Sequence, residues 1–199
     1  MMGRSHLLVG LSSAIVFDSV FHISGDPFTV AKTVPLALIL NKVIYYSSAA
    51  FGALLPDIDN AHSTLGLKLG FISKEIQHIA GHRRFFHSLL GLVFGSLLAI
   101  GLEQVIIVIL AQHNLIMPAE FIRGSHVVFF GVLFGCVMHI TADALTLGGV
   151  PLFWPSHKRY GFPQNPKFRF RTGSWPEFVV VWTLILLVIC GVFLSIIII

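Results

Sequence analysis

Three pairs of acidic and imidazole side chains stand at the edges of long apolar segments in this chain. In order they are Asp57 with Asp59, His82 with His87, and His139 with Asp143. The last pair is spaced i, i+4, so on a helix both side chains point to one face. Carboxylates and imidazoles are costly to bury in hydrocarbon unless they serve a purpose. We therefore expect the three pairs to share a metal site at one face of a membrane.

These donors fit a hydrolytic metal centre. Carboxylate oxygen and neutral imidazole nitrogen are good ligands for zinc, manganese or iron. With His6, which opens the first apolar segment, there are seven candidate ligands, more than one tetrahedral ion needs. They would suit two ions about 3.5–4 Å apart, or one ion with supporting groups and a general base. We expect one or two divalent ions, zinc or manganese, and hydrolysis of an ester, phosphoester or amide.

Three neighbouring residues are candidates for supporting roles. Arg83 adjoins His82, so it is placed to hold a phosphate oxygen and offset charge in the transition state. Ser88 and Thr146 are predicted hydrogen-bond donors to the ligands. Taken alone, each acidic or imidazole pair also has a structural reading, as a helix cap, interfacial residues or a buried packing pair. Their convergence at one depth favours the metal site.

The composition is that of a membrane protein. The 199 residues are 55% hydrophobic and only 11% charged, whereas a soluble domain has about 25% charged residues. Residues 1–199 are predicted to form a single integral-membrane domain. Cys136 and Cys190 lie in apolar segments and predict neither a disulfide framework nor a cysteine zinc site. The net charge of +4 is carried by loops, so we expect no nucleic-acid partner.

Five apolar segments must position the candidate ligands. They cover residues 6–23, 34–55, 86–110, 125–147 and 178–199. About 20 residues at 1.5 Å each cross the hydrocarbon core, so every segment is long enough. The expected fold is all-α, a transmembrane helical bundle of about five spans. The first segment lacks a convincing cleavage site, which predicts a retained helix and not a removed signal peptide.

The basic residues predict the orientation of the bundle. With five spans, the N-terminus and the two long loops share one side, which carries ten Lys/Arg against two on the other. Basic loops stay in the cytoplasm, so the N-terminus is predicted inside and the C-terminus outside. All seven candidate ligands then fall at the cytoplasmic ends of four spans.

The two long loops predict surface elements. Ile72, Ile76 and Ile79 are spaced for one helix face, with Ser73 as N-cap, which predicts a short amphipathic helix on the cytoplasmic membrane surface. The Phe/Arg alternation over residues 167–171 predicts an extended strand or hairpin edge near anionic headgroups. In the outer half of the bundle, Asp18 and Lys42 are predicted to pair.

Through these residues and their order, the chain resembles the YdjM-like family of bacterial inner-membrane proteins, which are predicted metal-dependent hydrolases. The shared motifs are Ser5-His6-Leu7-Leu8, Leu55-Pro56-Asp57-Ile58-Asp59, Ser63, Leu65-Gly66, Gly81-His82-Arg83, His87-Ser88-Leu89-Leu90, His139, Asp143, Thr146, Gly149-Val150-Pro151-Leu152, Trp154-Pro155 and Glu177. The resemblance implies a bacterial inner-membrane protein with a hydrolase-type metal site. The implied ligands are His6, Asp57, Asp59, His82, His87, His139 and Asp143. Arg84-Phe85-Phe86 replaces the family's frequent Gly-Phe-Thr, and Leu147 replaces a proline, which affects substrate choice more than metal binding.

The leading hypothesis is a membrane-embedded hydrolase that uses a metal-activated water against an ester or phosphoester. Its expected partners are membrane lipid and a lipid or amphiphilic substrate at the cytoplasmic leaflet, because the site lies at headgroup depth. One alternative is a metal or proton transporter, whose outer path would use Asp18, Lys42 and Glu103 together with His22 and His126. The other is a non-catalytic scaffold in which a structural metal braces four helices.

Overall fold

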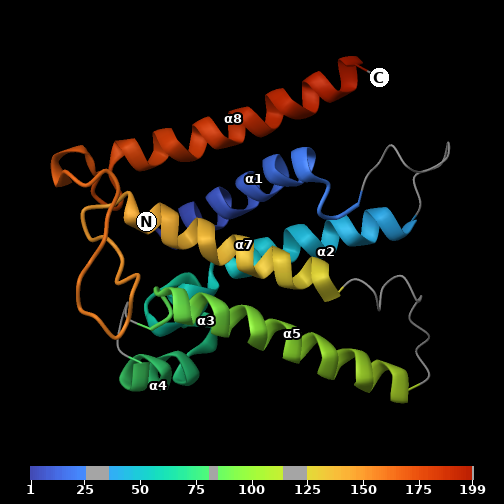
Figure 1. Cartoon of the computed structure of the whole chain (residues 1–199), viewed down its shortest axis with the longest axis horizontal. Helices are drawn as coiled ribbons and strands as arrows, with labels where there is room; N and C mark the ends of the chain where they lie inside the picture. The colour runs from blue at the N-terminus through green and yellow to red at the C-terminus, as the bar shows by residue number, and fades with distance from the viewer. Residues whose placement is uncertain (26–35, 81–84, 114–124, 199) are drawn as a thin grey trace.

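Five long helices dominate the computed structural model, which describes residues 1–25, 36–80, 85–113 and 125–198 (Figure 1). The helices are α1 (Gly3–Phe21), α2 (Leu36–Gly52), α5 (Leu89–Gln112), α7 (Ser125–Ala144) and α8 (Trp175–Ile198). Each lies within or close to one of the predicted apolar segments, so the all-α prediction is confirmed. Short elements join them: the 3₁₀ turns η2 (Leu55–Asp59) and η3 (Pro166–Phe168), and the helices α3 (Thr64–Leu69) and α4 (Phe71–Ala80).

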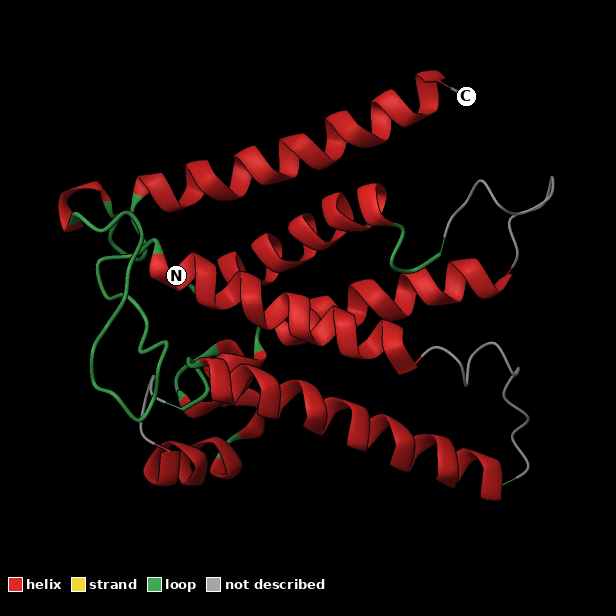
Figure 2. Cartoon of the chain, viewed as in Figure 1, coloured by secondary structure: helices red, strands yellow, loops and turns green. Residues whose placement is uncertain are grey.

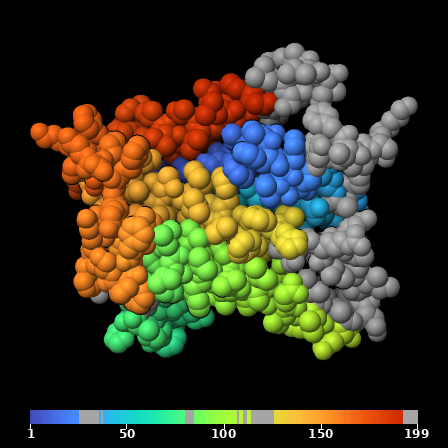
Figure 3. All heavy atoms as spheres, in the orientation of Figure 1, coloured from blue at the N-terminus to red at the C-terminus, as the bar shows by residue number. Residues whose placement is uncertain are grey.

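Three stretches of the described chain are long and apolar enough to cross a membrane. They are Leu38–Asp59, Leu89–Ile106 and His126–Ala144, and Trp175–Gly191 is a shorter apolar helix. Helix α1 carries Arg4 and Asp18 and is not among them. In the space-filling view, α5, α7, α1 and α8 lie side by side across one face (Figure 3). Large apolar side chains of α5 and α8 are exposed, as expected of lipid-facing surfaces.

Helix α7 forms the centre of the bundle and packs against α1, α2 and α5. Its contact with α2 is close because small residues meet there. A Cβ atom added to Gly135 would lie 2.1 Å from the carbonyl oxygen of Ala49, and one added to Gly52 would lie 2.3 Å from that of Val132. Small residues of this kind let helix backbones approach within a membrane. The close crossing fixes where the C-terminal half of α7 lies relative to the end of α2.

The predicted pair of Asp18 and Lys42 is confirmed. Lys42 Nζ donates to Asp18 Oδ2 at 3.0 Å. The same oxygen accepts from the hydroxyl groups of Ser24 at 2.7 Å and Tyr46 at 2.9 Å. Asp18 is fully buried, so these donors offset the cost of burying its charge. The cluster ties the end of α1 to α2.

The amphipathic helix predicted in the first long loop is present as α4, but Ser73 is not its N-cap. The helix begins at Phe71, and the Ser73 hydroxyl donates to the carbonyl of Ile58 at 2.6 Å. Ser73 therefore attaches α4 to η2 and does not start the helix. Phe71, Ile72 and Ile79 are exposed on α4.

The strand predicted over residues 167–171 is wrong. The described part of the chain has only isolated bridges, and one of them joins Phe170 to Thr146. Pro166 begins the turn η3 where the start of a strand was expected. Proline has no backbone N–H to donate to a neighbouring strand. The Arg169 guanidinium donates to the carbonyls of Pro163 and Gln164, which holds the loop in a compact shape. Most of the described loops gather at one end of the bundle (Figure 2).

Candidate metal centre

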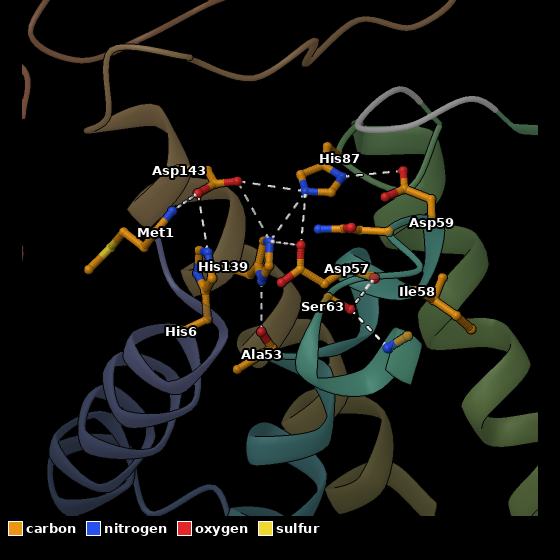
Figure 4. A network of polar contacts seen from close by, with 12 residues as sticks. Met1, His6, Ala53, Asp57, Ile58, Asp59, Ser63, His87, His139 and Asp143 are labelled. Atoms are coloured by element: carbon orange, nitrogen blue, oxygen red, sulfur yellow. Dashed lines mark hydrogen bonds and ion pairs between the residues drawn. The ribbon is translucent and has the colours of Figure 1, made fainter. Parts of the chain in front are cut away.

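Six acidic and imidazole side chains from four parts of the chain meet at the end of the bundle where these loops gather (Figure 4). They are His6 of α1, Asp57 and Asp59 of η2, His87 just before α5, and His139 and Asp143 of α7. None of the six is more than 4% exposed. Burial of so many ionisable groups in one place is uncommon and costly without a compensating charge.

The turn η2 presents the two aspartates because its backbone is held from several directions. Pro56 is the second residue of the turn. The Ser63 hydroxyl donates to the carbonyl of Asp57 at 2.8 Å and accepts from the amide of Gly66 at 2.9 Å, which caps α3. Ser73 holds the carbonyl between the two aspartates, as described above. The carboxylates therefore project from a braced turn.

Two similar devices position the remaining ligands. Ser88 caps α5: its hydroxyl donates to the carbonyl of Phe85 at 2.6 Å and accepts from the amide of Gly91 at 3.1 Å. This cap fixes the residue before it, His87. At the end of α7, the Thr146 hydroxyl donates to the carbonyl of Asp143 at 2.7 Å. Both hydroxyls thus hold a backbone carbonyl of the turn that carries a candidate ligand.

The tautomer of His139 follows from its neighbour. Nδ1 lies 2.7 Å from the carbonyl oxygen of Ala53. A carbonyl oxygen can only accept, so Nδ1 carries the proton and donates it. In the neutral ring Nε2 then has a free lone pair, which is the state that a metal ligand requires.

Four atoms, one each from His87, His139, Asp57 and Asp143, lie near one another; we call these residues the inner four. The Nε2 atoms of the two histidines are 3.4 Å apart. Asp143 Oδ2 lies 3.6 Å from His87 Nε2 and 3.8 Å from His139 Nε2. Asp57 Oδ1 lies 3.9 Å and 4.0 Å from the same two nitrogens. Ligands of a tetrahedral ion with bonds of about 2.0–2.1 Å lie about 3.3–3.4 Å apart, so the two nitrogens and each carboxylate oxygen are close to the spacing that one ion requires. Asp57, His87 and His139 form one group whose ligand atoms all lie within 4.8 Å of one another.

His6 and Asp59 flank the inner four. His6 Nε2 lies 3.2 Å from Asp143 Oδ1, and the His6 ring stacks on that of His139 with centroids 3.7 Å apart. The amino group of Met1 also contacts Asp143 Oδ1. His6, His139 and Asp143 form a second group whose ligand atoms all lie within 4.8 Å of one another. A single ion with supporting groups and a pair of ions therefore both remain compatible with the donors.

Comparisons with known proteins agree with the membrane helices and the motifs. The family model described as YdjM inner membrane protein matches residues 1–198. The chain belongs to this family. It is 40% identical to the inner membrane protein YdjM of Escherichia coli (strain K12) over 166 residues, which are 82% of this chain and 70% of the relative. The YdjM protein of Shigella flexneri matches equally well. The uncharacterized protein YvsG of Bacillus subtilis (strain 168) is 27% identical over 89% of this chain and 85% of its own length. No solved structure matches the chain significantly.

The structure brings six of the seven predicted ligands of this YdjM-family protein together. The seventh, His82, and the predicted anion contact, Arg83, lie outside the described residues. Ser88 and Thr146, predicted as hydrogen-bond donors near the site, bond to backbone carbonyls and hold the turns that carry His87 and Asp143. Their side chains therefore support the centre through the backbone.

Two groups important to the centre were not predicted. The carbonyl of Ala53 orients His139, and every residue has a carbonyl, so no signal in the sequence distinguishes this one. The capping role of Ser63 was open to prediction, because serine is among the preferred N-cap residues. Its second bond, to the carbonyl of Asp57, depends on the folded turn.

Proposed function

We propose that this YdjM-family protein is a membrane-embedded metal-dependent hydrolase that cleaves an ester or phosphoester. The observation that carries the proposal is the spacing of the inner four: the two imidazole nitrogens lie 3.4 Å apart, and each lies 3.6–4.0 Å from both carboxylate oxygens within a buried site. Zinc or manganese fits this donor set. When bound, such an ion supplies an activated water and a Lewis acid at neutral pH.

The chain's own residues would divide the remaining tasks. The inner four hold the ion, and His139 is fixed for this role by the carbonyl of Ala53. His6, which is packed against His139 and beside Asp143, is placed to move a proton at the edge of the centre or to contribute to a second ion. Arg83 is assigned the contact to an anionic substrate oxygen.

The proposed placement has five spans, with α1, α2, α5, α7 and α8 each crossing the membrane. The basic loops then lie in the cytoplasm, with the N-terminus inside and the C-terminus outside. Helix α4 would lie on the cytoplasmic surface, where its exposed Phe71, Ile72 and Ile79 enter the headgroup layer. The metal centre would then lie just below the cytoplasmic headgroups.

A lipid or another amphiphile is the proposed substrate, and an apolar groove formed by helices that carry candidate ligands supports it. The groove has a volume of about 350 Å³ and lies between α1, α7 and α8. Its walls include Val9, Met138, Ala142, Val180 and Leu184. Ala142 directly precedes Asp143, and Val9 lies one turn from His6, so an acyl chain in the groove would lie along the two helices that carry these residues. Residues 145–174 contain five basic and no acidic residues, which suits an anionic headgroup.

One observation favours a second candidate, the scaffold with a structural metal. The inner four would supply four protein ligands, enough to close a tetrahedral zinc site, whereas catalytic zinc sites keep one position open. An ion of higher coordination number, such as manganese, would retain open positions with the same ligands. The transporter is less favoured, since Ala14, Tyr45 and Ala49 form a fully buried layer between the centre and Asp18.

The test combines metal analysis with lipid hydrolysis. Purified wild-type protein and the double variant Asp57→Ala plus His139→Ala would be incubated with membrane lipid extracts, and the products compared by mass spectrometry. The control is Glu75→Ala plus His157→Ala, which removes an exposed acid and an exposed histidine. We expect stoichiometric metal and hydrolysis in wild type and control. The double variant should lose the metal and lower hydrolysis by more than about 100-fold, the largest loss expected from an outer-shell partner alone.

Two outcomes would contradict the proposal. Wild-type protein without stoichiometric metal, together with unchanged hydrolysis in the double variant, would remove the metal-dependent hydrolase. Stoichiometric metal without any lipid product, together with loss of folding on metal removal, would establish the scaffold instead.

A further inference from the structure

The two ring nitrogens of His87 face different carboxylates. Nε2 points toward the inner four, with Asp143 Oδ2 at 3.6 Å and Asp57 Oδ1 at 3.9 Å. Nδ1 lies 3.5 Å from Asp59 Oδ2. Figure 4 shows Asp59 on the side of the His87 ring away from His139 and Asp143. Asp57 and Asp59 are therefore separated by the imidazole, although they are only two residues apart.

This arrangement places Asp59 outside the reach of an ion held by the inner four. The two nitrogens of an imidazole direct their lone pairs or protons to different sides of the ring, so an ion at Nε2 lies away from whatever contacts Nδ1. A histidine that binds a metal usually donates its other N–H to a carboxylate, carbonyl or water, which fixes the ring orientation and makes the ligand more basic. Asp59 occupies the position of that acceptor.

We propose that Asp59 is a positioning residue that accepts the Nδ1–H of His87 and so presents Nε2 to the metal. The inference rests on the proposed metal centre and replaces the expectation that Asp59 is itself a ligand. The 3.5 Å contact is longer than a formed hydrogen bond of about 2.7–3.2 Å, and catalytic hydrogen bonds often tighten only when a site is loaded.

The local backbone supports this role. Asp59 ends the turn η2 and is fully buried. The carbonyls of Asp57 and Ile58 are both held by serine hydroxyls, of Ser63 and Ser73, so η2 cannot easily rotate to bring Asp59 to the inner four. The other central histidine, His139, has its Nδ1 fixed by a backbone carbonyl. Each central histidine thus has its own acceptor behind it.

Metal titration separates a positioning residue from a ligand. Full-length wild type, Asp59→Asn, Asp59→Ala and Asp57→Asn would be titrated with Co²⁺ against a competing chelator. We expect one-to-one binding in both Asp59 variants, with the affinity about 10–100-fold lower than in wild type. Asp59→Asn should be the milder change because its amide oxygen still accepts from Nδ1–H. Asp57→Asn should remove a ligand and so alter the Co²⁺ visible spectrum. The spectra of the two Asp59 variants should stay close to that of wild type.

A second measurement tests the contact without metal. ¹⁵N NMR of histidine-labelled protein, with His87 assigned by His87→Gln, should show the Nδ1–H tautomer in metal-free wild type and a shift toward Nε2–H in Asp59→Ala. An Asp59→Asn variant whose Co²⁺ spectrum is altered like that of Asp57→Asn would make Asp59 a ligand and overturn the inference. An Nε2–H tautomer in metal-free wild type would overturn it as well. Absence of metal from wild type would count against the proposed function, and the NMR result would still decide the role of Asp59.

Discussion

At the scale of single residues, two of the clusters that bury charge in the described chain have different partners. In the candidate metal centre, the aspartates face imidazoles whose spacing would allow a metal ion to bind. In the outer half, Asp18 is already surrounded by donors, from Lys42, Tyr46 and Ser24. The Asp18 cluster therefore needs no ion, and we interpret it as a structural tie between α1 and α2.

Removal of the Asp18 carboxylate tests this interpretation. Asp18→Ala leaves buried donors without their acceptor, so the free energy of unfolding should fall by about 1–3 kcal/mol. Metal affinity should stay unchanged, because Asp18 is about 18 Å from His6 along α1. Thermal unfolding in detergent and the Co²⁺ titration measure the two quantities. The control is Ser19→Ala, which removes an exposed hydroxyl on the same turn. Loss of metal binding in Asp18→Ala would link the two clusters and revive the transporter.

The sequence allowed some of these residue contacts to be predicted. Counting residues from the helix ends placed Asp18 and Lys42 at one depth, and a buried charge needs a partner, so their pairing followed. The same reasoning brought His6, His87 and Asp143 to one membrane face. The sequence could not distinguish the positions of Asp57 and Asp59. Which side of the His87 ring each carboxylate contacts depends on the turn η2 and on the two serine hydrogen bonds that hold it.

At the scale of elements, the centre depends on the crossing of α2 and α7. Helix α7 carries His139 and Asp143, and the end of α2 supplies Ala53 and leads into η2. A change in the distance between these helices would alter three of the inner four relative to one another. The small residues at the crossing are thus linked to the geometry of the metal centre.

Paired glycine substitutions test that link. Gly135→Ala would bring a Cβ to 2.1 Å from the Ala49 carbonyl oxygen, whereas a Cβ at Gly101 of α5 meets nothing within 4 Å. We expect Gly135→Ala to lower the free energy of unfolding by about 1–3 kcal/mol and to weaken Co²⁺ binding. The control, Gly101→Ala, should be neutral or stabilising by roughly 0.5–1 kcal/mol, with unchanged binding. Equal behaviour of the two variants would show that the crossing does not set the site.

Long elements were easier to predict than short ones. Apolar segments of about 20 residues indicated the five long helices, because length and hydropathy are strong signals. The short helix α3 was not predicted, since its six residues depend on the Ser63 cap and on packing against η2. The prediction of a strand over residues 167–171 was wrong, although Phe and Arg alternate there. Pro166 begins a 3₁₀ turn, and Arg169 donates to a loop carbonyl, so the segment folds as a loop.

At the scale of the whole molecule, most of the described loops lie at one end of the bundle (Figure 2), and the candidate metal centre lies at this end. This end carries most of the basic residues of the chain, including Lys158, Arg159 and Lys167. The proposed orientation places it in the cytoplasm, so a substrate would reach the centre from the cytoplasmic leaflet.

Cysteine labelling tests this orientation. Single cysteines at Lys158 and at His113, the described end of α5, would be placed in a Cys190→Ala background; Cys136 is buried. An impermeant maleimide applied to spheroplasts should label His113→Cys, while Lys158→Cys should react only after lysis. Labelling of Lys158→Cys in intact spheroplasts would invert the topology and move the metal centre to the outer leaflet.

X-ray absorption at the metal edge of the purified, metal-loaded protein tests the central claim most directly. We expect one tightly bound ion with two imidazole nitrogens and carboxylate oxygens at about 2.0–2.1 Å. His87→Ala and His139→Ala should each remove one imidazole, and the exposed-site control His157→Ala should remove none. A protein that binds no stoichiometric ion, or an ion whose spectrum keeps both imidazoles in the His87 and His139 variants, would contradict it.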